Sequence, residues 1–284
     1  MALKIAITGG AGFLGSSLAR ALLKRGTAAG PDDRQTEIGE LVLIDLVPAA
    51  IEDRRVRAVV VKELARDVLA RELGRDTDSV FHLAAVVSAG AEADFDLGMT
   101  VNVDGIRNVL ETCRALPRPP RLVFTSSIAA FGGVLPAVVP DGQAVTPTNS
   151  YGAQKAIGEL LVADYARKGY IDGRSLRLPT IVVRPGKPNK AASSFASGII
   201  REPLNGEGAI CPIARDTKVW ILSPRRAVAA LMTAHDLPAQ TWGPRAALNL
   251  NGLTVTVGEM AAALERVAGP QVAARINWQP DAAL

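Results

Sequence analysis

Thr8-Gly9-Gly10-Ala11-Gly12-Phe13-Leu14-Gly15 is the stretch that decides the fold. It stands between a short β-branched run and a segment whose apolar residues recur at helical spacing. Glycines in this spacing let the chain turn sharply, let a pyrophosphate approach the backbone, and let the helix pack closely on the strand. The start of the helix also offers N–H groups to phosphates. The sequence therefore predicts a dinucleotide-binding turn built on Gly9, Gly12 and Gly15.

Short apolar runs alternate with helical stretches through the first part of the chain. Continuous apolar runs are typical of strands buried on both faces of a parallel sheet. We expect strands at residues 4–7, 41–44, 56–61, 80–85, 122–124 and 175–184, and helices at residues 16–25, 63–73, 99–116 and 151–167. The alternation predicts an α/β fold of the Rossmann type, with a doubly wound parallel sheet. Residues 27–39, which are polar and contain Gly and Pro, are expected to form an exposed loop.

The pattern changes after Pro185, where several prolines break the chain into short pieces. We therefore predict a Rossmann domain over residues 1–185 and a smaller C-terminal substrate-binding lobe over residues 186–284. Within the lobe, Thr256-Val-Gly-Glu259 fits a capping box that opens a helix to about residue 267. The chain stops at Leu284 without an obvious closing element, so we expect a truncated or partly ordered version of a longer protein.

The composition excludes several classes of function. The chain has 284 residues, 32 Lys plus Arg against 28 Asp plus Glu, and 4% aromatic residues. A small, scattered basic excess with few aromatic residues does not indicate a nucleic-acid partner. Two cysteines and two histidines do not make a zinc cage or a disulfide framework, so we expect no metal and a cytoplasmic protein. No apolar run approaches the roughly 20 residues of a membrane span.

Asp45 ends the second apolar run of the sheet, in Leu43-Ile44-Asp45. A carboxylate at this position can accept hydrogen bonds from the adenosine ribose and would repel a 2′-phosphate. The pattern therefore favours NAD over NADP as the cofactor. Its distance from the glycine turn exceeds the usual spacing of roughly 20 residues, and residues 27–39 account for the excess.

Tyr151-Gly-Ala-Gln-Lys155 places a tyrosine and a lysine four residues apart, on one face of an expected helix. A nearby ammonium favours the phenolate and so makes the tyrosine a better general base. Ser127 follows the strand at residues 122–124, at the carboxyl edge where ligands bind in open α/β sheets. We expect Ser127 to hold a substrate oxygen beside the tyrosine, and the neighbouring Ser126 to be structural.

Together these motifs resemble the extended short-chain dehydrogenases/reductases, and the NAD-dependent epimerase/dehydratase branch fits best. The resemblance rests on the glycine turn, His82-Leu-Ala-Ala85, Asn102-Val-Asp-Gly105, the run at residues 125–127, and Tyr151 to Lys155. It implies a Rossmann domain that binds NAD, with Ser127, Tyr151 and Lys155 as the catalytic set. It further implies that the cofactor is contacted by Phe13, Leu14, Glu63, Leu64, Ala84, Ala85, Asn102, Tyr151, Lys155, Pro179, Thr180 and Ile181.

Two departures from the pattern of that branch argue against a sugar nucleotide as the substrate. Thr180 stands where that branch usually carries an asparagine toward the nucleotide diphosphate, and Phe131 replaces its usual tyrosine. The strings at residues 86–96, 178–189, 193–197 and 223–226 instead resemble a subgroup of dehydrogenases that oxidise a four-carbon sugar acid at C2. Tyr151 would then take the C2 hydroxyl proton, and the hydride would pass to NAD.

An acid substrate needs a cationic partner, and arginine is the preferred clamp for a carboxylate. Arg184, Lys187, Arg225 and Arg226 lie in the expected substrate lobe, and the sequence leaves open which one points inward. The residues expected to bind substrate are Ser88, Ser127, Tyr151, Arg184, Asn189, Ser193 and Arg225. His82 is expected to be a structural histidine rather than a base.

Two alternatives remain beside the sugar-acid dehydrogenase. One is an NAD-dependent sugar-nucleotide epimerase or dehydratase, which returns the hydride to its substrate. The other is a non-catalytic dinucleotide sensor, which has no need of a serine, a tyrosine and a lysine together. Extended members of the family are commonly dimers through a helix bundle, so the resemblance also implies a homodimer through residues 99–116 and 151–167.

Overall fold

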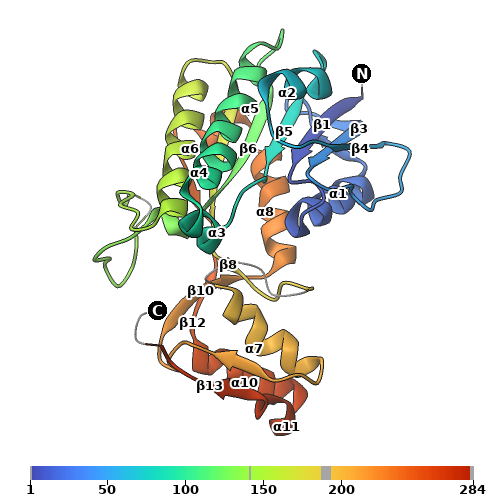
Figure 1. Cartoon of the computed structure of the whole chain (residues 1–284). Coiled ribbons are helices and arrows are strands. Elements are labelled where there is room, and N and C mark those ends of the chain that lie inside the picture. The colour runs from blue at the N-terminus through green and yellow to red at the C-terminus, as the bar shows by residue number, and fades with distance from the viewer. Residues whose placement is uncertain (1, 141, 187–192, 282–284) are drawn as a thin grey trace. The chain divides into compact units, whose positions relative to one another are not determined.

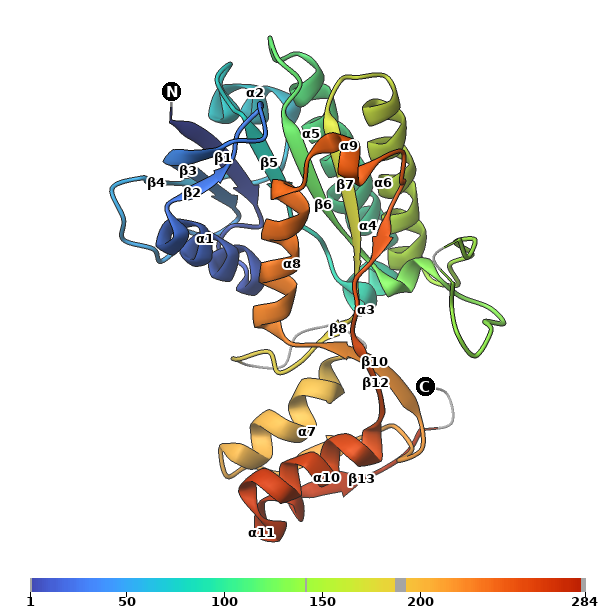
Figure 2. The ribbon, with the colours of Figure 1, turned by 180° about the vertical axis from the view of Figure 1, so that it is seen from behind.

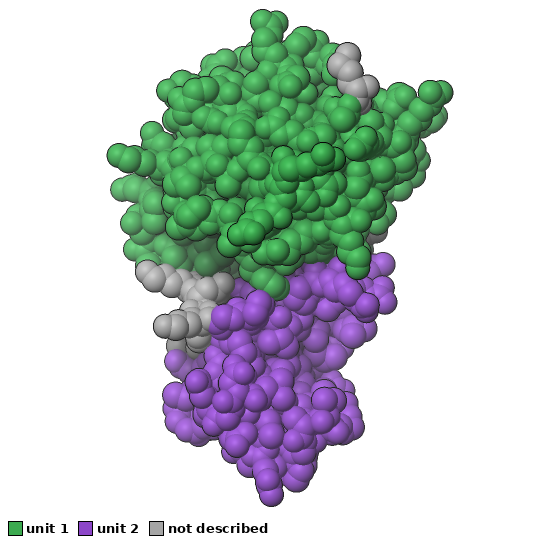
Figure 3. Space-filling view, turned by 90° about the vertical axis from the view of Figure 1, so that its right-hand side faces the viewer, with its two compact units in different colours: residues 1–177, 228–249 green, residues 178–227, 250–284 purple. Residues whose placement is uncertain are grey.

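The computed structural model describes residues 2–140, 142–186 and 193–281. Contacts between residues divide the chain into two compact units, coloured separately in Figure 3. Unit 1 comprises residues 1–177 and 228–249, and unit 2 comprises residues 178–227 and 250–284. Each unit has its own apolar core.

Unit 1 is an α/β unit whose strands and helices alternate along the chain. Its strands are β1 (Leu3–Thr8), β2 (Thr27–Ala29), β3 (Gln35–Asp45), β4 (Val56–Val60), β5 (Ser79–His82), β6 (Arg121–Ser127), β7 (Asp172–Leu178) and β11 (Leu248–Asn249). Its helices are α1 (Phe13–Arg25), α2 (Arg66–Leu73), α3 (Ser88–Ala93), α4 (Phe95–Gly98), α5 (Gly105–Arg114), α6 (Ser150–Arg167) and α9 (Ala239–Trp242). A π-helical turn at Met99–Asp104 precedes α5, and a 3-10 turn at Ile128–Ala130 follows β6.

The sheet of unit 1 runs in the order β11-β7-β6-β5-β1-β3-β2, with β4 also paired to β3. The pairings of β1 with β3 and β5, of β3 with β4, of β5 with β6 and of β7 with β11 are parallel. Helices α2, α5 and α6 cover one face of the sheet, and α1 and the later part of α8 (Pro224–Asp236) cover the other (Figures 1 and 2). This confirms the expected Rossmann-type α/β fold.

Residues 27–39 do not form the exposed loop that the sequence predicted. Thr27–Ala29 pairs antiparallel with residues 35–37, so the segment is a β-hairpin that lengthens β3. Asp33 lies in its turn with a φ of 62° and is ion-paired to Arg121 at 2.7 Å. Gly30-Pro31-Asp32 therefore marks a tight connection between two strands rather than a long loop.

Unit 2 contains β8 (Thr180–Ile181), α7 (Ser194–Leu204), β9 (Ala209–Cys211), β10 (Lys218–Leu222), β12 (Leu253–Thr256), α10 (Val257–Ala268), α11 (Pro270–Ala273) and β13 (Ile276–Trp278). Strands β12, β10 and β8 form one small sheet, and β13 and β9 form another. The expected capping box is present at the start of α10, where Thr256 Oγ1 accepts from Glu259 N at 3.0 Å and Glu259 Oε2 accepts from Thr256 N at 2.7 Å.

The division of the chain is less simple than the expected boundary at residue 185. Residues 228–249 return to unit 1 after the first stretch of unit 2. Two contacts hold residues 228–249 in unit 1. One face of α8 is buried, with Leu231 0% and Ala234 4% exposed, and β11 pairs with β7. A single cut at residue 185 missed this return because β11 has only two residues and shows no strand pattern of its own.

Candidate active site

The glycine turn joins β1 to α1 with its backbone in close contact with its surroundings. Gly9 has a φ of +73°, and a Cβ there would lie 2.7 Å from the backbone nitrogen of Ala84. A Cβ on Gly15 would lie 2.0 Å from the Gly9 carbonyl oxygen. A side chain at position 9 is therefore excluded by the loop that follows β5. A side chain at position 15, in the first turn of α1, is excluded by the backbone of Gly9.

This turn fits the phosphates of a dinucleotide. Helix α1 is capped by Gly12 without a side-chain hydrogen bond, and its first turn contains no acidic residue. The N–H groups and the positive dipole end of α1 are therefore unopposed by a side chain at the position where phosphates would approach. Phe13 and Leu14 begin this helix, which starts three residues before residue 16, where the sequence predicted its start.

Asp45 is the last residue of β3 and faces the glycine turn. Its Oδ2 accepts a hydrogen bond from Ala11 N at 2.9 Å, and its Oδ1 accepts one from Leu46 N at 2.7 Å. Each carboxylate oxygen keeps a lone pair that can accept from a further donor. The half-buried carboxylate thus fixes the turn and leaves a negative charge beside it.

His82 ends β5 in a fully buried position. Its Nδ1 is 2.7 Å from Thr8 Oγ1, and its ring stacks on Phe124 with 5.9 Å between centroids. Burial, and secondarily the charge of Lys155, lowers the pKa of His82 to about 3. The imidazole is neutral at physiological pH, which agrees with a structural role.

Two adjacent serines at the end of β6 have different partners. Ser126 Oγ donates to Glu159 Oε1 at 2.5 Å in the interior, where Ser126 is 3% exposed. Ser127 Oγ is half-buried and accepts from Ala129 N at 3.1 Å. Because the Ala129 N–H occupies a lone pair of Ser127, the hydroxyl hydrogen of Ser127 can be donated elsewhere. Ser126 is thus tied to the interior, and the substrate role of Ser127 stays a prediction.

Helix α6 carries Tyr151 and Lys155 and lies directly against β6. A Cβ on Gly152 would be 2.0 Å from the Ala129 carbonyl oxygen, and one on Gly158 would be 2.6 Å from the Phe124 ring. Glycine at these two positions therefore brings the helix close to the strand. It places the start of α6, where Tyr151 is the second residue, against the turn that follows Ser127.

Lys155 is 2% exposed, and its ammonium is surrounded by backbone and aromatic rings. Nζ donates to the Thr125 carbonyl oxygen at 2.9 Å and lies 4.8 Å from the ring centroid of Phe124 and 5.7 Å from that of Tyr151. Burial lowers the pKa of Lys155 to about 8, although the Glu159 carboxylate opposes the shift. A cation beside the Tyr151 ring is the arrangement that favours a phenolate.

Unit 1 contains most of the residues expected to contact the cofactor, as well as Ser88 and Ser127, which are expected to bind substrate. Asp45 and Ser127 end strands, Ser88 begins α3, Asn102 lies in the π-helical turn, and Tyr151 and Lys155 lie in the first two turns of α6. The others lie in the glycine turn and the start of α1 or just after β5: Gly9, Gly12, Phe13, Leu14, Gly15, Ala84 and Ala85. Leu64 packs on the core of the unit and its carbonyl oxygen accepts from Asn108 at 3.0 Å, whereas Glu63 is exposed.

The other expected residues belong to unit 2. Pro179 precedes β8, and Thr180 and Ile181 pair with β10. The Arg184 guanidinium donates to Ser193 Oγ at 3.3 Å, and the Arg184 backbone N–H donates to the buried Ser197 Oγ at 3.0 Å. Arg225, at the start of α8, is exposed. Asn189, like Lys187, lies outside the described residues.

Sequence reasoning missed a buried polar network beside the expected catalytic residues. Glu159 accepts from Arg177 Nε at 2.9 Å and from Arg177 Nη2 at 2.7 Å, in addition to its bond with Ser126. The same guanidinium lies 4.8 Å from the Phe131 ring. Glu159 lies at i+4 from Lys155, so helical spacing could have placed it on the face of Tyr151.

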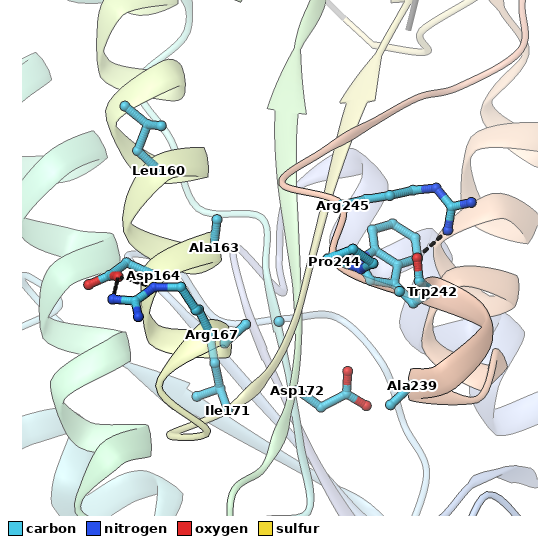
Figure 4. A pocket seen from close by; sticks show the side chains of 13 residues that line it. Leu160, Ala163, Asp164, Arg167, Ile171, Asp172, Ala239, Trp242, Pro244 and Arg245 are labelled. Carbon is cyan, nitrogen blue, oxygen red and sulfur yellow. Dashed lines mark hydrogen bonds and ion pairs between the residues drawn. The ribbon is translucent and has the colours of Figure 1, made fainter. Parts of the chain in front are cut away.

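A separate pocket of about 620 Å³ lies in unit 1 between α6 and residues 239–245 (Figure 4). Two ion-paired or hydrogen-bonded arginines border it: Arg167 binds Asp164 at 2.6 Å, and Arg245 donates to the Trp242 carbonyl. None of the expected site residues lines this pocket.

Within residues 2–140, 142–186 and 193–281, no three His, Cys, Asp or Glu side chains cluster so as to hold a metal ion. None of the helices in that part of the chain is both long and apolar enough to cross a membrane.

Comparison with known proteins agrees with this geometry. The model of the NAD dependent epimerase/dehydratase family matches residues 5–228. The chain is 57% identical over 281 residues to D-erythronate dehydrogenase of Cupriavidus necator, covering 99% of this chain and 86% of that protein. It is 44% identical over 281 residues to D-erythronate dehydrogenase of Haemophilus influenzae, covering 98% and 87%.

Solved structures share the fold over nearly the whole chain. A nucleoside-diphosphate-sugar epimerase from Agrobacterium tumefaciens has a TM-score of 0.90 and 42% identity, covering 99% of this chain and 82% of that one. An L-threonine dehydrogenase from Cupriavidus necator has a TM-score of 0.83 and 28% identity, covering 98% and 86%.

Proposed function

Because the chain belongs to the NAD dependent epimerase/dehydratase family, we propose that it oxidises D-erythronate at C2 to 2-oxo-D-erythronate, with NAD as the hydride acceptor. The observation that carries this proposal is the 57% identity with a D-erythronate dehydrogenase across 99% of the chain. A serine, a tyrosine and a lysine suited to this oxidation occupy the end of β6 and the start of α6.

A nicotinamide dinucleotide suits the residues of the glycine turn, where Cβ atoms would occupy the space that the backbone needs. Asp45 supports NAD rather than NADP. A carboxylate held at 2.9 Å from Ala11 N places negative charge beside the turn, and that charge would repel a 2′-phosphate. When bound, the nicotinamide ring supplies the hydride acceptor, and the protein supplies orientation and electrostatics.

Tyr151 is the general base in this proposal. Its phenolate takes the proton of the C2 hydroxyl, and the buried Lys155 ammonium near its ring favours that phenolate. Ser127 donates its hydroxyl hydrogen to the same substrate oxygen, since a lone pair of Ser127 already accepts from Ala129 N. A purely cofactor-sensing module would not need these three groups together.

Arg184 is our choice for the carboxylate of the substrate. Its guanidinium is half-buried and lies beside Ser193, whereas Arg225 and Arg226 are exposed on the first turn of α8. A partly desolvated guanidinium binds a carboxylate more strongly than one in open water. We further propose that Ser88, Asn189 and Ser193 bind substrate hydroxyls, and that Pro179, Thr180 and Ile181 form the wall near the nicotinamide.

The cytoplasm is the proposed location, with two buried thiols in support. Cys113 and Cys211 are both free and buried, and burial raises the pKa of Cys113 to about 12. Protonated, buried thiols are suited to a reducing compartment.

The direct test is NADH formation, followed by absorbance, from NAD with D-erythronate and, in parallel, with L-threonate. The proposal predicts NADH with D-erythronate and much less with L-threonate. A UDP-sugar is included because one solved relative is described as a sugar epimerase. Interconversion of the UDP-sugar without net NADH, together with no reaction of either acid, would replace the proposal with the epimerase alternative.

A further inference from the structure

Gln154 lies between Tyr151 and Lys155 in the sequence, and it is only 1% exposed. The proposed chemistry does not use its side chain. The amide lies against α4, since a Cβ on Gly98 would be 2.5 Å from Gln154 Nε2. A side chain at position 98 would push the end of the Gln154 side chain out of the place where it lies. The packing at this point is therefore built around a polar side chain rather than an apolar one.

Among the described residues, the side-chain oxygen of Gln154 has one hydrogen-bond partner, and that partner in turn holds a backbone segment. Gln154 Oε1 accepts from Asn102 Nδ2 at 2.7 Å. Asn102 in turn binds both backbone groups of Val86: its Oδ1 accepts from Val86 N and its Nδ2 donates to Val86 O, each at 2.9 Å. The Asn102 amide thus pairs with Val86 as a neighbouring strand would.

Only one orientation of the Asn102 amide satisfies these three hydrogen bonds. If the amide were flipped, Val86 N–H would face an NH₂ group and the Val86 carbonyl would face an oxygen. Gln154 Oε1 reinforces the observed orientation because it can accept only from a donor, which Nδ2 is. Asn102 is 2% exposed and lies in the π-helical turn, so water does not readily replace this partner.

The nitrogen of Gln154 makes the arrangement costly. Gln154 Nε2 is buried and has no hydrogen-bond partner among the described residues. A buried donor without a partner loses its hydration and gains nothing in return. Methionine has a similar length and would fill the same space without that cost. The amide is therefore explained by its oxygen, which holds Asn102, and not by packing.

The loop that is held by Asn102 lies next to the glycine turn. Ala84, two residues before Val86, meets Gly9 so closely that a Cβ on Gly9 would be 2.7 Å from its nitrogen. Ser88, two residues after Val86, begins α3. A shift of Val86 would therefore move Ala84, beside the glycine turn, and Ser88, which is proposed to bind substrate.

We propose that Gln154 is a positioning residue: through Asn102 and Val86 it sets the loop of residues 83–88 in the conformation that binds the dinucleotide. This rests on the proposed function for its cofactor, but its test does not need the substrate. The contacts that carry it all lie within unit 1.

Gln154→Met removes the oxygen while keeping the volume. We expect the Kd and the KM for NAD to rise about tenfold and kcat at saturating NAD to stay within about twofold. The Tm should change little, because the variant removes the unpaired Gln154 Nε2 but leaves one Asn102 N–H without its acceptor. Asn102→Ala should weaken NAD binding at least as much, and adding Gln154→Met to it should change nothing further. Leu160→Met, on the exposed face of the same helix, is the matched control.

Amide hydrogen exchange of the apo protein provides the second readout. Exchange over residues 83–90 should become faster in Gln154→Met, and the double variant should exchange no faster than Asn102→Ala alone. A lower Tm with unchanged NAD affinity, or additive effects of the two substitutions, would overturn the proposal. Since NAD affinity and exchange are measured without D-erythronate, an inactive wild-type protein would count against the proposed reaction and not against the role of Gln154.

Discussion

The ammonium of Lys155 donates to the carbonyl oxygen of Thr125 at 2.9 Å, so a charged group of α6 is held at the carboxyl end of β6. One backbone carbonyl and two aromatic rings replace part of the water that the ammonium loses on burial. The replacement is incomplete, because burial still lowers the pKa of Lys155 to about 8 from 10.5. The cation is kept despite its cost, which is expected where it supports a reacting group.

This cost predicts how stability depends on pH. Between pH 8 and 10.5 the unfolded chain holds a proton on Lys155 that the folded chain has released, so the burial cost diminishes as pH rises. Lys155→Met removes this dependence. In this window the free energy of unfolding of the wild type should rise with pH relative to that of the variant, by up to about 1.4 kcal/mol per pH unit. Urea unfolding at a series of pH values measures it, and parallel curves would be inconsistent with a buried ammonium.

Tyr151→Phe tests the general base. Removal of the hydroxyl should lower kcat by about 10²–10⁴-fold, which is the usual contribution of a positioned acid or base, and leave the Kd for NAD unchanged. Tyr170→Phe is the control, because Tyr170 is 38% exposed and packs edge-on against Tyr165 away from the glycine turn. If Tyr151→Phe kept wild-type turnover, another residue would have to be the base.

Gly15→Ala tests the close packing of the glycine turn. The added Cβ would lie 2.0 Å from the Gly9 carbonyl oxygen, so the backbone must move. We expect a loss of about 1–3 kcal/mol in the free energy of unfolding and at least about tenfold weaker NAD binding. Gly142→Ala, where a Cβ would meet nothing within 4 Å, should change neither. Calorimetric titration with NAD and thermal melts provide both quantities, and a Gly15→Ala protein that bound NAD normally would refute the assignment of the turn.

Asp45→Ser tests the choice of cofactor. The substitution removes the negative charge beside the turn, so the ratio of kcat/KM for NAD to that for NADP should fall by about 100-fold. Asp216→Ser, on an exposed turn of unit 2, changes the net charge equally and should leave the ratio unchanged. Initial rates with both cofactors measure the ratio, and a wild-type ratio in Asp45→Ser would show that selectivity comes from elsewhere.

The parts of the site that the sequence revealed are those determined by local spacing. Gly9, Gly12 and Gly15 determine one turn, and Tyr151 and Lys155 lie on one helical turn, so short-range geometry was enough. The separate roles of Ser126 and Ser127 remain a prediction, although their hydroxyl groups do have different hydrogen-bond partners.

The parts that the sequence did not reveal depend on contacts between distant segments. The hairpin of β2 and β3 was missed because Thr27–Ala29 is too short to show alternation. The link from Gln154 to Asn102 spans 52 residues, and that from Glu159 to Ser126 spans 33. No local pattern marks a buried glutamine or glutamate as a partner until the helix is packed on the sheet.

The most direct test of the central claim uses D-erythronate carrying deuterium at C2. Incubation with NAD and the full chain, followed by mass spectrometry of the NADH, shows which carbon loses its hydride. We predict that the NADH carries the deuterium and that the other product is 2-oxo-erythronate. NADH without deuterium would place the oxidation at another carbon, and the absence of NADH would contradict the proposed reaction altogether.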